Sequence, residues 1–158
     1  MVRVVFNGAA SAGVKTEVIR DKGILTCGLL DTLEHLGYRT EFVVTFVITG
    51  RGGSGGGRNT IDVMVKHPDD WLDLDKIAFA CAHPASLRRL AFSIWEQQPA
   101  DVVKYYGIGS GYGQPTQPAI EEGVVYIPEI HLGEVSTPES QMELIRTTLA
   151  KVGVTFDN

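Results

Sequence analysis

The sequence lacks any hydrophobic segment long enough to cross a membrane. Apolar runs such as residues 42–44 and 46–48, which Thr45 separates, fall far short of the roughly 20 residues that a spanning helix needs. It also lacks an excess of positive charge, with 14 Lys and Arg against 19 Asp and Glu. This balance disfavours sequence-independent binding to nucleic acid. No secretory signal follows Met1, so we expect a cytoplasmic protein.

Cysteine is scarce as well. Cys27 and Cys81 lie in apolar segments without a Cys-x-x-Cys pattern or a neighbouring histidine cluster, so we expect reduced thiols in the core. With 158 residues, 44% of them apolar, the chain is long enough to bury one core, and we expect a single domain over residues 1–158. Composition alone does not identify a function.

Four segments have the composition of strands. Residues 2–6 are almost entirely apolar, as in a buried parallel strand, and residues 124–127 form a similar short run. Residues 39–49 and 59–66 are rich in β-branched side chains, and the second alternates in polarity. The glycine-rich tract 50–58 between them predicts a flexible hairpin tip, which makes the pair an antiparallel hairpin at a sheet edge.

Helices are predicted between these strands. A stripe of small and apolar residues indicates a long amphipathic helix from Val14 to Leu36, ended by Gly37. Asp73 can cap a second helix that Pro84 interrupts, and a third follows Pro84. Its buried stripe is expected to comprise Leu87, Leu90, Ala91, Ile94 and Trp95.

The last part of the chain is predicted as strand, loop, strand and helix. Residues 101–106 are interpreted as a short strand, and the glycine- and proline-rich segment 107–118 as a loop. After the strand at 124–127, Thr137 and Pro138 begin a helix. Its apolar face is expected to consist of Met142, Ile145, Leu149 and Val152.

This order of elements predicts a three-layer α/β fold with a mostly parallel central sheet and an antiparallel edge hairpin. In such sheets the ligand crevice lies beyond the carboxyl ends of the strands. The loops expected to line it are residues 7–13, residues 107–116, and either residues 67–73 or His83, depending on strand order.

Several segments resemble a known family. Residues 7–11 (NGAAS) at the end of the first strand, residues 20–23 (RDKG) and residues 29–41 resemble the start of von Willebrand factor A-like, Rossmannoid domains. The chain is more closely similar to an uncharacterised actinobacterial and phage-encoded protein family, a likeness that continues through 83–92, 111–115 and Ile127-Pro128. Such proteins often have sequence before the first strand, so we expect a compact or N-terminally trimmed version.

The resemblance implies a degenerate metal site. Metal-binding A domains carry Asp-x-Ser-x-Ser where this chain has Asn7, Gly8, Ala9, Ala10 and Ser11, so only the last hydroxyl is kept. The later loop, 107–118, has no acidic residue. We therefore expect neither a metal nor a cofactor. The resemblance also suggests a phage or mobile-element origin, and with it a virion-associated location as an alternative to the cytoplasm.

Candidate partner-binding residues are Asn7 and Ser11 at the first strand end and Tyr112 and Gln114 in the glycine-rich loop. Asn7 also suits a turn and Ser11 a helix cap. A possible ligand loop comprises His83, Gly109, Gly111 and Gly113, although this loop lacks the Lys-Ser/Thr of a P-loop.

Other polar clusters have simpler interpretations. Asp69, Asp70, Asp73 and Asp75 fit helix capping better than a metal loop. His83 is not accompanied by a pattern typical of a catalytic site. Arg51 and Arg58 fit a hairpin tip better than a nucleic-acid contact.

Three functions follow from these residues. The first is a non-enzymatic protein-interaction or assembly module that binds another protein, in a phage or host assembly, through the loops at the strand ends. The second is a metal-assisted enzyme acting on nucleotides or phosphoesters. The third is a nucleic-acid-associated accessory factor that uses Arg51, Arg58, Arg88 and Arg89.

Overall fold

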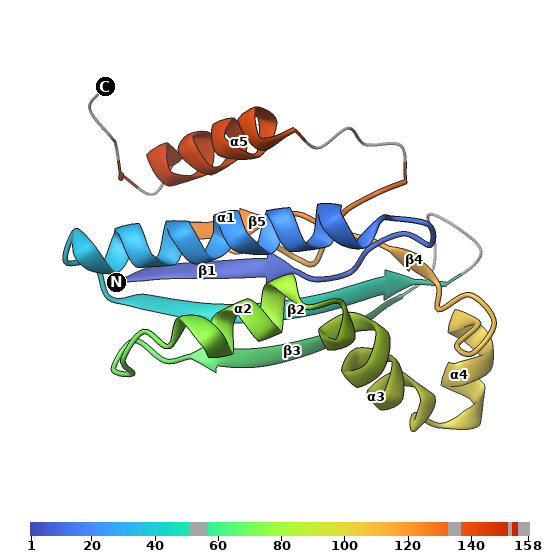
Figure 1. Ribbon diagram of the computed structural model, residues 1–158. Coiled ribbons are helices and arrows are strands. Elements are labelled where there is room, and N and C mark those ends of the chain that lie inside the picture. The colour runs from blue at the N-terminus through green and yellow to red at the C-terminus, as the bar shows by residue number, and fades with distance from the viewer. Residues whose placement is uncertain (51–56, 133–136, 152, 155–158) are drawn as a thin grey trace.

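The computed structural model describes residues 1–50, 57–132, 137–151 and 153–154. It contains a mixed, open sheet of five strands in the order β3-β2-β1-β5, with the short β4 paired to β2 (Figure 1). The first strand is therefore internal, as its apolar composition predicts. The strands are β1 (Val2–Asn7), β2 (Thr40–Thr49), β3 (Arg58–Lys66), β4 (Gln114–Pro115) and β5 (Val124–Ile127).

Strand direction differs between the two halves of the sheet. β1 runs parallel to both β2 and β5, whereas β3 and β4 run antiparallel to β2. The antiparallel edge hairpin is confirmed, but the sheet is mixed rather than mostly parallel. The reason is that β2 receives two antiparallel neighbours, one of them from a segment predicted as loop.

The helices are α1 (Thr16–His35), α2 (Leu74–Ala82), a π-helical turn η1 (Ser86–Ala91), α3 (Phe92–Glu96), α4 (Ala100–Tyr106) and α5 (Pro138–Lys151). Figure 1 shows α1 and α2 against one face of the sheet, with α5 beside α1. The main core fills the space between these helices and the sheet. It includes Val4, Phe6, Phe42, Leu30 and Trp95.

The opposite face of the sheet is covered in part by the loop before β5. Residues 118–121 lie over it and enclose a cavity of about 330 Å³ with side chains of β1, β2, β3 and β5. Polar residues such as Arg3, Thr45 and Asp62 occupy this face. The expected third layer is thus wrong. Where the structure describes the chain, the core-forming helices share one side of the sheet, and the other face carries a mixture of polar and apolar side chains.

The boundaries of α1 and α2 confirm the predicted caps. Gly37, with a φ of +84°, follows the end of α1, and the N–H of Tyr38 donates to the carbonyl of Leu33 at 3.0 Å. At α2, Asp73 Oδ1 accepts the N–H of Lys76 at 3.0 Å. Local turn chemistry therefore decides where both helices begin or end.

The predicted strand at residues 101–106 is wrong, because this segment forms α4. Pro99 precedes the helix, and Gly107 ends it with a φ of +63°. A run of valines and tyrosines is compatible with either structure over so short a length. The proline and the left-handed glycine at its two ends favour the helix.

The helix after Pro84 departs from the predicted stripe. Leu87, Ala91 and Trp95 are buried, but Leu90 and Ile94 are 52% and 45% exposed. The cause is the π-helical turn η1, which widens the repeat so that every fourth residue faces the core. An α-helical period places Leu90 and Ile94 inward, and this is the error in the prediction.

Other expectations have mixed outcomes. Cys27 and Cys81 are free thiols, one partly buried and one buried. On α5, Ile145 and Leu149 are buried but Met142 is 41% exposed, and Val152 lies outside the described residues. The tip predicted at 50–58 falls largely on residues 51–56, which are also outside the described residues.

None of the helices described is long and apolar enough to span a membrane.

Candidate functional site

Asn7 ends β1 and is completely buried. Its Nδ2 donates to the carbonyl of Thr116 at 2.9 Å, to Tyr126 Oη at 3.1 Å and to Glu129 Oε2 at 3.1 Å. Its Oδ1 accepts the N–H of Ala9 at 3.1 Å. Asn7 therefore connects the segments that follow β4, β5 and β1, and its side chain holds these loops together rather than reaching the surface.

Glu129 continues this network toward the surface. Its Oε2 accepts a hydrogen bond from Tyr126 Oη at 2.7 Å, and its Oε1 lies 3.4 Å from Nε2 of His131. Burial raises the pKa of Tyr126, and the neighbouring Glu129 carboxylate raises it further. The phenol therefore stays a hydrogen-bond donor, and the Glu129 carboxylate is occupied by three neighbours.

A lysine provides the positive charge at these strand ends. Lys22 is 6% exposed, and its Nζ donates to the carbonyls of Asn7, at 2.8 Å, and Pro128. The same Nζ lies 4.2 Å from the centroid of the Phe6 ring, a cation–π contact. The carbonyl-rich ends of β1 and β5 are thus stabilised by a cation that the chain itself supplies.

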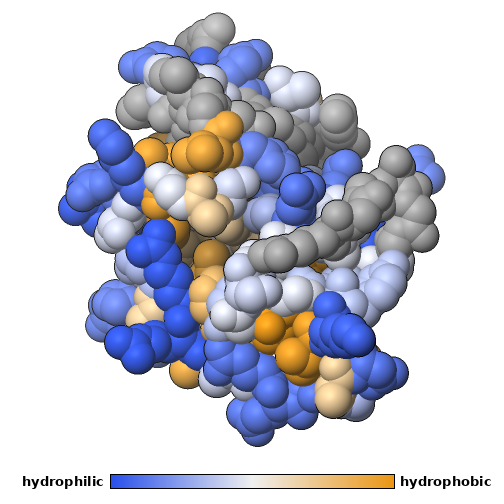
Figure 2. Space-filling view, turned by 90° about the vertical axis from the view of Figure 1, so that its right-hand side faces the viewer, coloured by the Kyte–Doolittle hydropathy of each residue, from blue (hydrophilic) through white to orange (hydrophobic). Residues whose placement is uncertain are grey.

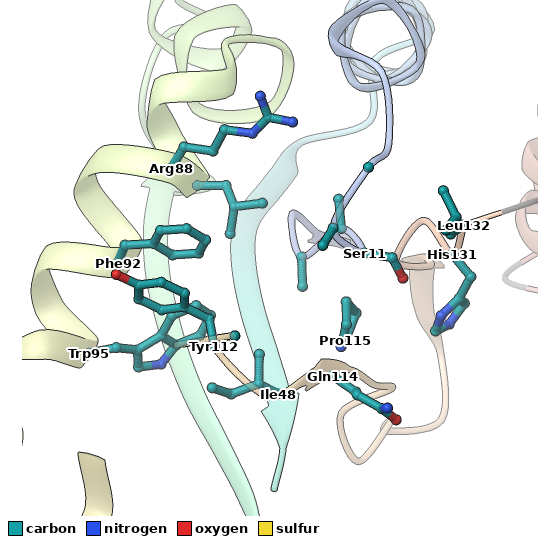
Figure 3. Close-up of a pocket in the computed structure, with 17 residues that line it drawn as sticks. Ser11, Ile48, Arg88, Phe92, Trp95, Tyr112, Gln114, Pro115, His131 and Leu132 are labelled. Carbon is teal, nitrogen blue, oxygen red and sulfur yellow. The ribbon is translucent and has the colours of Figure 1, made fainter. Parts of the chain in front are cut away.

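A pocket of about 810 Å³ opens at this end of the sheet (Figure 3). Its walls come from the loop after β1, from η1 and α3, from the glycine-rich loop before β4 and from the segment after β5. Figure 2 views the molecule from this end and shows apolar surface between hydrophilic side chains. The lining residues are Ala9–Gly13, Ile48, Leu87, Arg88, Phe92, Trp95, Gly111–Pro115, His131 and Leu132.

One wall of the pocket is aromatic. The rings of Phe92 and Tyr112 are stacked, with centroids 3.8 Å apart and an interplanar angle of 7°. Tyr112 also donates its hydroxyl to Glu96, a hydrogen bond that raises the pKa of the phenol. Its φ of +51° lies in the left-handed region, which is unusual for a tyrosine. Trp95 completes this wall and is fully buried.

Polar groups lie around the rest of the pocket. Figure 3 shows Ser11 and His131 on the side opposite the aromatic wall, Gln114 below them and Arg88 at the upper rim. The parallel bridge between Ala10 and Ile130 brings Ser11 and His131 side by side. None of the lining residues within the described part of the chain is an aspartate or glutamate, although the chain as a whole has a net charge of −5.

The structure brings most of the predicted site residues together. Ser11, Tyr112 and Gln114 line the pocket, as do Gly111 and Gly113. Asn7 lies behind it, buried in the network described above.

Two predicted ligand-loop residues lie elsewhere. His83 is outside the pocket lining, where its Nδ1 accepts the N–H of Ala85 at 3.2 Å and its ring stacks on Phe79. Gly109 does not line the pocket either. Residues 67–73 also fail to line it, because they follow the antiparallel β3, whose carboxyl end lies at the opposite edge of the sheet.

Sequence reasoning missed Arg88, His131 and Leu132 as pocket residues. His131 and Leu132 follow the last parallel strand, so the strand-end rule that identified residues 7–13 could have found them. Arg88 lies outside the buried stripe predicted for its helix, and the π-helical turn that carries it has no recognised sequence signal.

Three of the four arginines proposed for nucleic-acid binding lie in the described part of the chain, and two of these, Arg88 and the exposed Arg89, are adjacent in η1. Arg88 lines the pocket, Arg58 begins β3, and Arg51 is outside the described residues.

Where the structure describes the chain, no group of three or more His, Cys, Asp or Glu side chains is arranged to hold a metal ion. At the position of the degenerate motif, the Asn7 side chain instead makes hydrogen bonds to neighbouring loops.

A family model of a domain of unknown function, DUF7192, matches residues 1–155, and the chain therefore belongs to this family. No curated protein and no solved structure matches the chain.

Proposed function

We propose that this member of the DUF7192 family is a non-enzymatic protein-interaction module with a von Willebrand factor A-like fold. The observation that carries the proposal is the strand-end pocket of about 810 Å³, in which loops after β1 and β5 meet the glycine-rich loop and the helical pair η1–α3. Ser11, Tyr112 and Gln114 are the proposed contact residues, and Asn7 positions their loops.

The composition of the pocket supports binding. Its walls are mainly apolar and aromatic, with a few hydrogen-bonding side chains between them, and this is the usual make-up of sites that bind a ligand by shape and a few polar contacts. The buried network around Asn7 and Glu129 fixes the loops, so little ordering remains to oppose binding. A segment of a partner protein is the occupant that we propose.

Pocket-filling substitution tests this function. Ala12 is exposed and lines the pocket, so Ala12→Trp obstructs it, whereas Ile24→Trp adds the same side chain at a position on α1 that is 56% exposed and outside the lining. In affinity purification from cells that encode the protein, we expect wild type and Ile24→Trp to retain the same partner. The Ala12→Trp variant should retain little of it. Equal retention by Ala12→Trp contradicts the proposal.

The partner is then titrated directly. Calorimetry with the purified partner should show affinity weakened at least about tenfold by Ala12→Trp, which corresponds to about 1.4 kcal/mol. The phage or mobile-element origin, and with it a cytoplasmic or virion-associated location, stays a prediction that the neighbouring genes test.

An enzymatic role is the second candidate, favoured by one observation. Ser11 and His131 are neighbours across the Ala10–Ile130 bridge, and Glu129 lies 3.4 Å from the imidazole. Incubation with nucleotides and phosphoesters, with and without divalent cations, tests it. Turnover that His131→Ala abolishes and His35→Ala preserves supports catalysis over binding.

A further inference from the structure

Arg88, at the rim of the pocket, makes a single hydrogen bond within the described part of the chain. Its Nη2 donates to the carbonyl of Val14 at 3.1 Å, just before α1 begins. A guanidinium has five N–H groups in a planar fork, so this bond fixes its position and leaves donors for a further acceptor. The π-helical turn η1 carries this arginine, and π-helical turns are frequent at functional sites.

Two main-chain donors lie on the same rim. Residues 11–14 form a turn closed by the N–H of Val14 donating to the carbonyl of Ser11 at 3.2 Å, and Gly13 has a φ of +89°. The N–H groups of Ala12 and Gly13 have no acceptor within the described part of the chain. Both residues line the pocket, next to the carbonyl that holds Arg88.

The electrostatics of this rim favour an anion. Among the residues that the structure describes, the pocket lining contains Arg88 and His131 but no carboxylate. The nearby acidic groups are engaged elsewhere: Glu129 with Asn7 and Tyr126, and Glu96 with Tyr112. An anion at the rim therefore meets donors, and none of the described lining residues carries a negative charge.

Apolar side chains accompany these donors. Leu132 is 68% exposed and lies close to the turn, since a Cβ at Gly13 would be 3.3 Å from its Cδ1. Leu87, on the η1 side, is buried and also lines the pocket. A ligand that presents a carboxylate to Arg88 can therefore place an apolar side chain against Leu132.

We propose that the pocket recognises the C-terminal residue of a partner protein, with its free carboxylate at Arg88 and the N–H groups of Ala12 and Gly13. This inference rests on the proposed function and specifies its ligand. A planar monoanion matches one guanidinium fork, and capture of a C-terminal carboxylate by main-chain N–H groups is a known mode of peptide recognition. A chain end also suits a pocket with walls on both sides (Figure 3).

The probe is N-acetyl-alanyl-alanyl-leucine, titrated as the free acid and as the C-terminal amide by ¹H–¹⁵N NMR. We expect the acid to shift the amide signals of Ala12 and Gly13 and to bind at least about tenfold more tightly than the amide, because the amide lacks the charge-assisted hydrogen bonds. Arg88→Gln should remove this preference for the acid. Arg89→Gln, the same change on the adjacent exposed residue outside the pocket lining, should preserve it.

Several results overturn this inference. One is equal binding of acid and amide, and another is the same loss in Arg89→Gln as in Arg88→Gln. Inorganic phosphate binding as tightly as the acid shows a general anion site instead. Absence of any shift at about 10 mM peptide, enough to saturate a site with millimolar affinity, also overturns it.

Failure of the C-terminal ligand and failure of the proposed function give different experimental results. If the partner requires an open pocket in the Ala12→Trp experiment but binds unchanged after deletion of its own last three residues, the interaction module stands and the C-terminal ligand is wrong. If Ala12→Trp leaves partner binding intact, the proposed function itself fails.

Discussion

Lys22 donates a hydrogen bond from its buried Nζ to the main-chain carbonyl of Asn7 at 2.8 Å, and a second to the carbonyl of Pro128. The ammonium group on α1 thereby ties the carboxyl ends of β1 and β5 to each other. It also lies over the ring of Phe6. The strand ends behind the pocket are therefore stabilised by a charge that α1 contributes.

Replacement of this lysine should destabilise the protein. Lys22→Met keeps a side chain of similar length but leaves two carbonyls without a donor, and we expect a loss of about 2–4 kcal/mol in the free energy of unfolding. Urea unfolding followed by circular dichroism measures it. Lys104→Met, an exposed change on α4, is the control and should stay within about 0.5 kcal/mol of wild type. Equal stability of the two variants would show that the two hydrogen bonds contribute little.

Two glycines of α1 should respond to alanine in opposite directions. A Cβ at Gly23 would lie 2.4 Å from Cα of Ala82, so Gly23→Ala forces α1 and α2 apart and should cost about 1–3 kcal/mol. Gly28 has nothing within 4 Å of the same position, so Gly28→Ala should stabilise the helix by about 0.5–1 kcal/mol. Thermal unfolding of both variants tests this. A stabilising Gly23→Ala contradicts the close packing of the helices.

The π-helical turn makes a third pair of predictions. Leu87 is 6% exposed, and Leu87→Ala should lower the free energy of unfolding by about 2–4 kcal/mol. Leu90, 52% exposed, should tolerate the same change within about 0.5 kcal/mol. Chemical denaturation of the two variants distinguishes this arrangement from a regular α-helix, in which Leu90 also faces the core and both changes are costly.

The pair formed by Glu34 and Lys66 should contribute stability that depends on pH. Their charged atoms are 2.9 Å apart, and Thr40 donates to the same carboxylate oxygen from its N–H and its hydroxyl. Burial acts to raise the pKa of Glu34, but the hydrogen bonds from Thr40 and Lys66 outweigh it and hold the pKa below its usual value.

Because the pKa of Glu34 is lower in the folded state than in the unfolded state, the stability that this pair contributes decreases on acidification. The stabilisation is complete above the unfolded pKa of about 4.3 and is lost as pH falls through the lower folded pKa. In Glu34→Gln the unfolding free energy should therefore fall less steeply with acidification than in wild type. Denaturant titrations from pH 6 to pH 3 measure the slope, and the exposed Glu122→Gln should keep the wild-type slope. A wild-type slope in Glu34→Gln refutes the assignment.

Much of the secondary structure follows from local sequence. The β-branched run of β2, the glycine after α1 and the Asp73 cap of α2 each act through neighbouring residues, and the predicted elements formed there. The apolar first strand also predicted its internal place in the sheet. Residues 101–106 were misassigned because a short apolar segment is compatible with both helix and strand.

The sequence by itself determined the α/β class and the edge hairpin, and it named the loops after β1 and before β4 as candidate walls of a crevice. Only the tertiary structure decided that Asn7 is buried behind the pocket, that Arg88 and His131 line it, and that Lys22 neutralises two strand ends. The physical reason is that these roles depend on partners distant in sequence: Asn7 bonds to Thr116 and Glu129, and Lys22 to Pro128. Periodicity identifies the apolar face of an element, but long-range contacts determine which polar side chains meet.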